Sequence, residues 1–253
     1  MNIFITGASK GIGRATALFF AEKGWFIGVT DVDRSGLAKL EKELSGKQYF
    51  AAIMDVTDSD GVAKTINDFC AKNDGKLDVL FNNAGVAWMD PFESVPLQNH
   101  HAMINVNVTG VLNCTFHAFP YLKKTQGARV INMCSAAAHY GVPWEVTYSA
   151  TKFFIRGLTE ALNLEWERHD IHVCDIMPNF VDTPMMEPCH SKVVENVGIK
   201  LTTQDVVNAV WKASHKKRVN WLVEFFPYNI LQPLAQYTPR FIVRSIMKKK
   251  AGL

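Results

Sequence analysis

Tyr148 and Lys152 lie four residues apart in a stretch whose apolar residues recur at helical spacing, so both side chains are expected on one face of a helix. Ser135 comes thirteen residues before Tyr148, directly after a short apolar run that predicts a strand. A reaction that leaves negative charge on a carbonyl oxygen needs one group that donates a proton to the oxygen and another that holds it. A phenol has a free pKa of about 10, and a nearby ammonium favours its phenolate form. The three residues therefore suit proton transfer to or from a substrate oxygen, with Tyr148 as the acid or base.

Each of these residues also has an ordinary structural interpretation. A tyrosine and a lysine at this spacing form a common solvent-exposed helix pair, and a serine after a strand is a common turn residue. The interpretation as a reaction site therefore depends on the other motifs of the chain.

The first predicted strand, Asn2–Thr6, runs directly into a glycine-rich turn that precedes a helical pattern. Glycines allow a tight turn and a close approach of the backbone, and a helix N-terminus offers free N–H groups and the positive end of its dipole. Strand, turn and helix in this order predict a site for the pyrophosphate of a dinucleotide, although the spacing Gly-x-x-x-Gly-x-Gly differs from the usual Gly-x-Gly-x-x-Gly. The residues expected at the cofactor here are Gly7, Ser9, Lys10, Gly11, Ile12 and Gly13.

Asp31 ends the second predicted strand, eighteen residues beyond Gly13. An acidic side chain at this position can bind the ribose hydroxyls of the adenosine and repel a 2′-phosphate, which favours NAD over NADP. Lys10 or Arg34 could instead accept a phosphate, so NADP stays open. The ordinary alternative for Asp31 is a helix-capping or solvated aspartate.

The elements that must position these residues alternate along the chain as short apolar runs and helix-length amphipathic segments. This alternation predicts an α/β fold, a Rossmann-type doubly wound sheet of seven parallel strands flanked by helices. We expect one catalytic domain over residues 1–225, with a helical extension of the same domain over residues 226–253. The strands are expected at Asn2–Thr6, Phe26–Thr30, Tyr49–Ile53, Leu77–Phe81, Arg129–Met133, His172–Met177 and Trp221–Phe225, and helices at Gly13–Lys23, Leu37–Leu44, Val62–Lys72 and Phe153–Arg168.

The longest run without a charged residue, Ser94–Leu122, contains Asn and His residues that argue against a membrane span. A buried helix is predicted there instead. Asn107 lies within this run, and an amide at such a position has the ordinary interpretation of a satisfied core group.

Taken together, these motifs resemble the short-chain dehydrogenase/reductase family, whose patterns are Thr-Gly-x-x-x-Gly-Ile-Gly and Tyr-x-x-x-Lys. The family's Asn-Ser-Tyr-Lys tetrad is matched at Asn107, Ser135, Tyr148 and Lys152. The resemblance, which covers residues 1 to about 225, implies that Lys152 also binds the nicotinamide ribose, Ser135 polarises the substrate oxygen and Asn107 holds a water in a proton relay.

Further positions match the same family. The resemblance implies adenine contacts from Asp55 and Val56, and it implies that a Pro-Gly-x-Val-x-Thr element after the sixth strand holds the carboxamide of the nicotinamide. This chain has Asn179 in place of that glycine, and Asn is the next most tolerant residue of a left-handed backbone. The additional cofactor residues implied are Asn82, Ala84 and Gly85 after the fourth strand and Pro178, Val181 and Thr183 after the sixth.

On the substrate side, the Met- and Pro-rich segment Thr183–Lys200 is expected to form a mobile lid. The residues expected to contact substrate are Ala137, Val142, Trp144 and Met185, so the pocket should be mostly apolar and should take a lipophilic secondary alcohol, ketone or aldehyde. A 3-oxoacyl thioester is the alternative substrate, which basic residues at the pocket mouth would favour. The alternative of another class is a sensor or scaffold that binds NAD(H) without turnover.

The basic C-terminal segment has two interpretations, because Arg240, Arg244 and Lys248 repeat every four residues beside apolar ones. Such an amphipathic helix either contacts a membrane surface or packs as a cap on the pocket or on a partner subunit, which we slightly prefer. The net charge of +3 does not favour nucleic acid. Five cysteines without a CxxC pair, no signal peptide and no metal-ligand pattern predict a reduced cytoplasmic protein without a metal. The resemblance implies a homodimer or homotetramer formed through the helices of Ala102–Lys123 and Thr147–Arg168.

Overall fold

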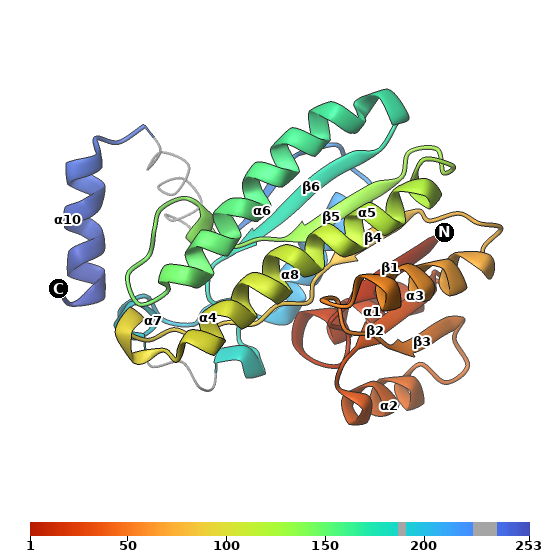
Figure 1. Ribbon diagram of the computed structural model, residues 1–253, viewed down its shortest axis with the longest axis horizontal. Coiled ribbons are helices and arrows are strands. Elements are labelled where there is room, and N and C mark those ends of the chain that lie inside the picture. The colour runs from red at the N-terminus through yellow and green to blue at the C-terminus, as the bar shows by residue number, and fades with distance from the viewer. Residues whose placement is uncertain (187–190, 225–236) are drawn as a thin grey trace.

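A computed structural model describes residues 1–186, 191–224 and 237–253. Seven strands form one parallel sheet in the order β3-β2-β1-β4-β5-β6-β7 (Figure 1). The predicted doubly wound α/β fold is therefore confirmed. The strands are β1 Asn2–Thr6, β2 Phe26–Asp31, β3 Tyr49–Ile53, β4 Val79–Asn82, β5 Arg129–Met133, β6 His172–Pro178 and β7 Asn220–Val223. The end of the last predicted strand, Phe225, lies outside the described residues.

The helices begin somewhat earlier than the apolar pattern predicts, because polar first turns precede the apolar residues. Asp33 and Asp58 accept the Gly36 and Gly61 N–H groups at the starts of α2 and α3, and Thr202 forms a capping box with Asp205 at the start of α8. The helices are α1 Gly11–Glu22, α2 Arg34–Glu43, α3 Ser59–Ala71, α4 Leu97–Ile104, α5 Gly110–Leu122, α6 Val146–Glu165, α7 Lys192–Val197, α8 Thr203–Ala213 and α10 Arg240–Ala251.

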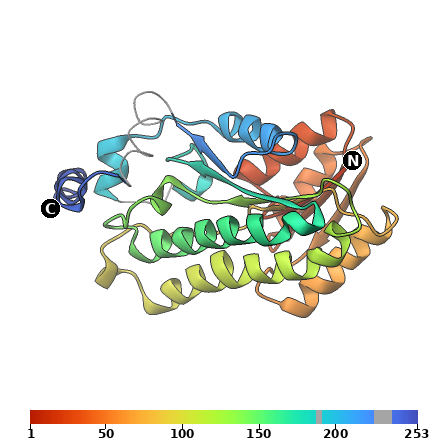
Figure 2. The same cartoon turned by 90° about the horizontal axis from the view of Figure 1, so that it is seen from above.

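Helices cover both faces of the sheet, as the view from above shows (Figure 2). On one face, α1, α2 and α8 pack against the sheet through Phe20, Leu40 and Val210, all fully buried. On the other face, α3 packs through Ile66 and Phe69, and α5 packs through Cys114, Ala118 and Leu122. Burial on both faces explains why the strands are apolar throughout rather than alternating.

The segment predicted as one buried helix, Ser94–Leu122, is α4 and α5 joined by a π-helical turn at Asn105–Thr109. The prediction of burial is wrong for one face, because Phe116 is 75% exposed and Leu112 and Ile104 are also exposed. The apolar residues of this run thus serve both the core and an outer surface.

The C-terminal helix α10 stands at one end of the molecule beside α7 (Figure 1). It is held by Val243 and Ala251, which are buried, and by the Asn196 amide, which donates a hydrogen bond to the Lys250 carbonyl at 2.8 Å. Within the described residues, no helix is both long and apolar enough to span a bilayer.

Candidate active site

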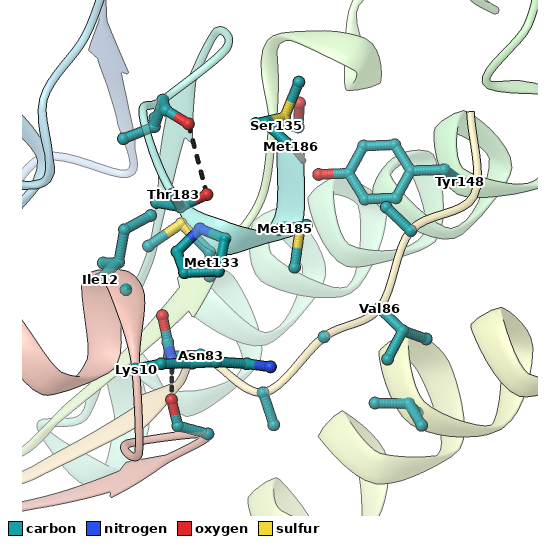
Figure 3. Close-up of a pocket in the computed structure, with 18 of the residues that line it drawn as sticks. Lys10, Ile12, Asn83, Val86, Met133, Ser135, Tyr148, Thr183, Met185 and Met186 are labelled. Carbon is teal, nitrogen blue, oxygen red and sulfur yellow. Dashed lines mark hydrogen bonds between the residues drawn. The ribbon is translucent and has the colours of Figure 1, made fainter. Parts of the chain in front are cut away.

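One cavity of about 550 Å³ lies at the carboxyl ends of the strands. Its walls come from the ends of β1 to β6, around the point where the chain order changes direction between β1 and β4. Open α/β sheets bind their ligands in the crevice at such a switch point. The close-up shows Lys10 and Asn83 on one side of this cavity and Tyr148, Ser135 and Met185 on the other (Figure 3).

The glycine turn after β1 has the backbone geometry that the sequence predicts for a phosphate site. Gly7 and Gly11 have φ values of 65° and 56°, which L side chains rarely adopt. A Cβ on Gly13 would lie 2.2 Å from the Gly7 carbonyl oxygen. The first turn of α1 has no side-chain cap, and Gly11 and Ile12 at its start line the cavity, so N–H groups of this turn are available to a ligand there. These features fit the pyrophosphate of a dinucleotide.

Asp31 anchors the glycine turn to the end of β2. One carboxylate oxygen accepts the Ser9 N–H at 2.9 Å and the other accepts the Asp33 N–H at 2.9 Å. Asp33, rather than Asp31, is the cap of α2, and its bonds from Gly36 and Ser35 hold the pKa of that carboxyl below its ordinary value. Both carboxylates line the cavity, as does Lys10, whereas Arg34 does not.

Asn83 fixes the strap that crosses the cavity after β4. Its amide donates to the carbonyls of Thr6 and Gly7 at 2.9 Å each, and the Thr6 hydroxyl accepts the N–H groups of Asn83 and Ala84. Residues 83–89 line the cavity, including Ala84 and Gly85. Asn82 does not line it, because its amide is buried and donates to Asn132 and Thr115.

Tyr148, Lys152 and Ser135 meet on one wall of the cavity. The Lys152 nitrogen lies 5.4 Å from the centre of the Tyr148 ring and donates a hydrogen bond to the Met133 carbonyl at 2.8 Å. The Ser135 hydroxyl accepts the Ala137 N–H at 3.1 Å, so it caps the 3₁₀ turn Ala136–Ala138 and also faces the cavity. The Tyr148 hydroxyl points from α6 toward the side of Ser135 (Figure 3).

Burial lowers the pKa of Lys152. The side chain is only 5% exposed, and loss of water lowers the pKa of its ammonium from the ordinary value. The Met133 carbonyl, which accepts a hydrogen bond from the Lys152 nitrogen, favours the charged form in the opposite sense.

Asn107 lies in the π-helical turn and does not line the cavity. Its side chain exchanges two hydrogen bonds with the Val86 backbone at 2.9 Å each and donates to the Thr151 hydroxyl at 3.2 Å. It thus ties the strap to the helix that carries Tyr148. A π-turn of this kind is often found at functional sites because it displaces one side chain from the helical register.

Most of the expected cofactor residues line the cavity, and a few do not. Ser9 and Gly13 support the turn from outside the cavity wall. Those that line it are Gly7, Lys10, Gly11, Ile12, Asp31, Asp55, Val56, Ala84, Gly85, Tyr148, Lys152, Pro178, Val181 and Thr183.

Of the residues expected to contact substrate, Met185 lines the cavity, and Ala137, Val142 and Trp144 do not. Trp144 has a φ of 69°, and its indole N–H donates to the Ala251 carbonyl at 3.1 Å. It joins the segment before α6 to the C-terminal helix. Part of the predicted lid, residues 187–190, lies outside the described residues.

Three residues that were not expected from the sequence also line the cavity, namely Asn83, Phe180 and Glu145. Glu145 is 2% exposed, and its Oε1 has no hydrogen-bond partner among the described residues. Burial raises the pKa of its carboxyl to about 8. One signal was available, because Glu145 is the only acidic residue between Glu93 and Glu160. Among the described residues, no group of three or more His, Cys, Asp or Glu side chains could hold a metal ion.

Comparison with known proteins gives consistent matches. The family model described as short chain dehydrogenase matches residues 1–194. A 3-oxoacyl-(acyl-carrier-protein) reductase of Thermotoga maritima is 34% identical over 193 residues, 76% of this chain and 78% of its own. A serine 3-dehydrogenase of Agrobacterium fabrum is 33% identical over 239 residues, 90% of this chain and 94% of its own.

Among solved structures, the 3-ketoacyl-(acyl-carrier-protein) reductase from Brucella melitensis complexed with NADH superposes with a TM-score of 0.80. It is 27% identical and covers 88% of this chain and 96% of its own.

Proposed function

The chain belongs to the short-chain dehydrogenase family and is a nicotinamide-dependent oxidoreductase acting on CH–OH groups, and we propose that it interconverts a lipophilic secondary alcohol and the corresponding ketone or aldehyde with Tyr148 as acid and base. One observation carries this proposal: Tyr148, Lys152 and Ser135 line the same cavity as the glycine turn. The proposed reaction site and the proposed cofactor site are therefore parts of one cavity.

Three side chains of this chain would bind the substrate oxygen and transfer the proton. The nicotinamide, when bound, supplies or accepts the hydride. Ser135 holds the substrate oxygen by a hydrogen bond, and Tyr148 donates its proton to that oxygen in reduction or takes it in oxidation. The Lys152 ammonium stabilises the phenolate that remains. Asn107 is a positioning residue, because its hydrogen bonds connect the Val86 backbone to Thr151 on the helix that carries Tyr148.

For the cofactor we propose NAD in preference to NADP. Asp31 and Asp33 both line the adenosine end of the cavity, and two carboxylates there would repel a 2′-phosphate. Lys10 is the only exposed base among the described cavity residues, and Arg34 lies outside the wall. Gly7, Gly11 and the start of α1 would bind the pyrophosphate.

The substrate end of the cavity supports a lipophilic ligand. Its described walls there are mostly apolar, namely Val86, Ala87, Trp88, Met89, Phe180, Met185 and Met186. Apolar walls with a few placed polar groups are typical of sites for small lipophilic molecules.

A 3-oxoacyl thioester is the second candidate, because one similar protein is named a 3-oxoacyl-(acyl-carrier-protein) reductase. The described cavity residues hold only two bases, Lys10 at the cofactor end and buried Lys152. The absence of a base at the substrate end of this described wall favours the smaller alcohol or ketone.

We further propose that the protein is a cytoplasmic homo-oligomer, with residues 226–253 as an extension of the catalytic domain. Phe116 and Leu112 on α5 and Phe153 on α6 are exposed apolar side chains, and the two helices run side by side (Figures 1 and 2), which supports a partner subunit on this face. Peripheral membrane contact through α10 is supported by exposed Phe241 and Ile242 beside its basic residues.

The function is tested by reduced-nicotinamide turnover with NAD(H) and NADP(H) in parallel, across lipophilic alcohols, ketones and one 3-oxoacyl thioester. We expect NAD(H)-dependent turnover of a secondary alcohol or ketone. Exclusive turnover of the thioester would replace the proposed substrate class with the second candidate, and tight cofactor binding without any turnover would contradict the proposal.

A further inference from the structure

Glu145 is a buried acid in the wall of the reaction cavity, and it forms no salt bridge with any of the described residues. It lies three residues before Tyr148, at the N-terminal boundary of α6, and is 2% exposed. Its Oε1 has no hydrogen-bond partner among the described residues. Because an unpaired carboxylate in such a place costs free energy, the group needs either a proton or a cation beside it.

The backbone around Glu145 holds it firmly in this position. The Glu145 N–H donates to the Val142 carbonyl at 3.2 Å, and its carbonyl accepts the Ser149 N–H at 2.7 Å. The preceding residue, Trp144, has a left-handed backbone and is tied to Ala251. A bulky residue in that conformation is strained by roughly 1–3 kcal/mol and persists only where its surroundings enforce it.

The other buried charge of the site has the opposite sign. Lys152 is an ammonium 5% exposed, one turn along α6 from Tyr148. A substrate that carried its own ammonium would be repelled by Lys152 unless a carboxylate nearby compensated it. Glu145 is the only acidic residue of the described cavity wall outside the cofactor end, where Asp31, Asp33 and Asp55 lie.

We propose that Glu145 is the anionic half of a subsite for an ammonium group, and that the substrate is an amino alcohol or amino ketone whose amine lies close to the reacting carbon. The proposal rests on the proposed function and narrows its substrate class. The ammonium takes no part in the bond changes: in oxidation the carbinol hydride goes to NAD, the hydroxyl proton goes to Tyr148, and the amine keeps its protons. Glu145 gives its own proton to solvent when the cation enters.

The proposal is tested with three alcohols that differ only beside the carbinol: 2-aminooctan-3-ol, octan-3-ol and octane-2,3-diol. Wild-type enzyme should oxidise the amine with at least about tenfold higher kcat/KM than either analogue. Glu145→Gln keeps the shape and loses the charge, and it should lower kcat/KM for the amine by at least about thirtyfold, as expected when one partner of a buried ion pair is removed. Its kcat/KM for octan-3-ol should fall by a much smaller factor, so the ratio of the amine value to the octan-3-ol value should fall at least about tenfold.

Glu165→Gln is the matched control, since Glu165 is the exposed last residue of α6. It should match wild type on all three alcohols. If Glu145→Gln lowers turnover of all three alcohols equally, or if wild type shows no preference for the amine, Glu145 does not bind an ammonium. A selective loss on the diol would instead identify a neutral carboxyl that binds a substrate hydroxyl, and would overturn the proposal.

Calorimetric binding of 2-aminooctane, which cannot be oxidised at a carbinol, separates this proposal from the proposed function. With NAD bound, 2-aminooctane should bind wild type and not Glu145→Gln. Such binding without turnover of any alcohol would leave the ammonium subsite standing and contradict the proposed function. Turnover of octan-3-ol with no binding of 2-aminooctane would do the reverse.

Discussion

Two ionisable side chains of opposite sign, Lys152 and Glu145, lose most of their water within one cavity. Burial lowers the pKa of Lys152 and raises the pKa of Glu145 to about 8, so each group is displaced toward its neutral form. Such displacements are typical of functional sites because catalysis and recognition need charges in places where water does not support them.

The raised pKa of Glu145 predicts a dependence of stability on pH. Because the carboxyl keeps its proton in the folded state and loses it in the unfolded state between pH 4.5 and about 8, its contribution to stability is lost as the pH rises through this window. The Gln side chain of Glu145→Gln cannot titrate, so the variant does not lose this contribution. The free energy of unfolding of the variant minus that of wild type should therefore increase from pH 5 to pH 8, by at most about 4 kcal/mol. Urea unfolding of both apoenzymes at the two pH values checks this, and Asp175 titrates alike in both. An unchanged difference would show that Glu145 is ionised in the folded protein.

Asp31→Asn tests the cofactor preference at a single carboxylate. The amide keeps an acceptor for the Ser9 N–H but removes the charge facing the adenosine end, so the ratio of kcat/KM for NAD to that for NADP should fall at least about tenfold. Steady-state kinetics with both cofactors measures the ratio. Asp58→Asn, at the exposed cap of α3, is the control and should leave it unchanged. A preference of the wild-type enzyme for NADP would contradict the proposal that NAD is the cofactor.

For single residues, the sequence predicts those that belong to motifs with a characteristic spacing. It does not predict those whose role depends on burial or on contacts made only in the folded protein. Tyr148, Lys152 and Ser135 share the cavity as expected. Glu145 was missed because its one sequence signal, isolation from other acidic residues, does not show that the side chain is buried in the cavity wall. Trp144 was expected at the substrate, but its indole reaches the C-terminal helix instead.

At the scale of elements, apolar runs predict the strands well, and the errors have physical causes. β4 was expected at Leu77–Phe81 and is found at Val79–Asn82. Leu77 is fully buried but lies before the strand, with its N–H bound to the Thr125 hydroxyl. Asn82 belongs to the strand although it is polar, because Asn132 and Thr115 satisfy its amide. An apolar run in the sequence indicates which residues are buried. It gives the ends of a strand only approximately, because strand pairing can begin after the first buried residue and extend to a polar one.

The C-terminal helix α10 gives a prediction of its own. α10 packs on α7, as the preferred interpretation as a cap expects. Phe241, Ile242 and Ile246 stay exposed beside basic residues, and this pattern suits the alternative role as a contact with an anionic bilayer surface. We expect the protein to float with vesicles containing anionic lipid at low salt and not with neutral ones.

Replacing the three exposed side chains of α10 with serine should abolish flotation with the anionic vesicles. Leu97→Ser and Leu164→Ser remove exposed apolar side chains elsewhere and should leave flotation unchanged. If wild type ignores anionic vesicles at low salt, α10 has no membrane role.

At the scale of the whole molecule, the apolar outer face of α4, α5 and α6 predicts self-association. Phe116 is 75% exposed on this face, and Ile104 and Val146 border a shallow groove between α4 and α6. Light scattering coupled to size exclusion should give a mass of two or four chains, and Phe116→Lys should shift it toward the monomer because a charge would be buried at the contact. A monomer at micromolar concentration would contradict this.

The central claim is that Tyr148 transfers the proton during hydride transfer, and Tyr148→Phe tests it most directly. The variant should lower kcat by about 100-fold or more while the dissociation constant of NAD stays within about threefold, because the ring and the Lys152 charge remain and only the hydroxyl is lost. Tyr140→Phe, a tyrosine outside the cavity wall, should retain full activity. Turnover by Tyr148→Phe at the wild-type rate would contradict the account, since another group would then be the acid.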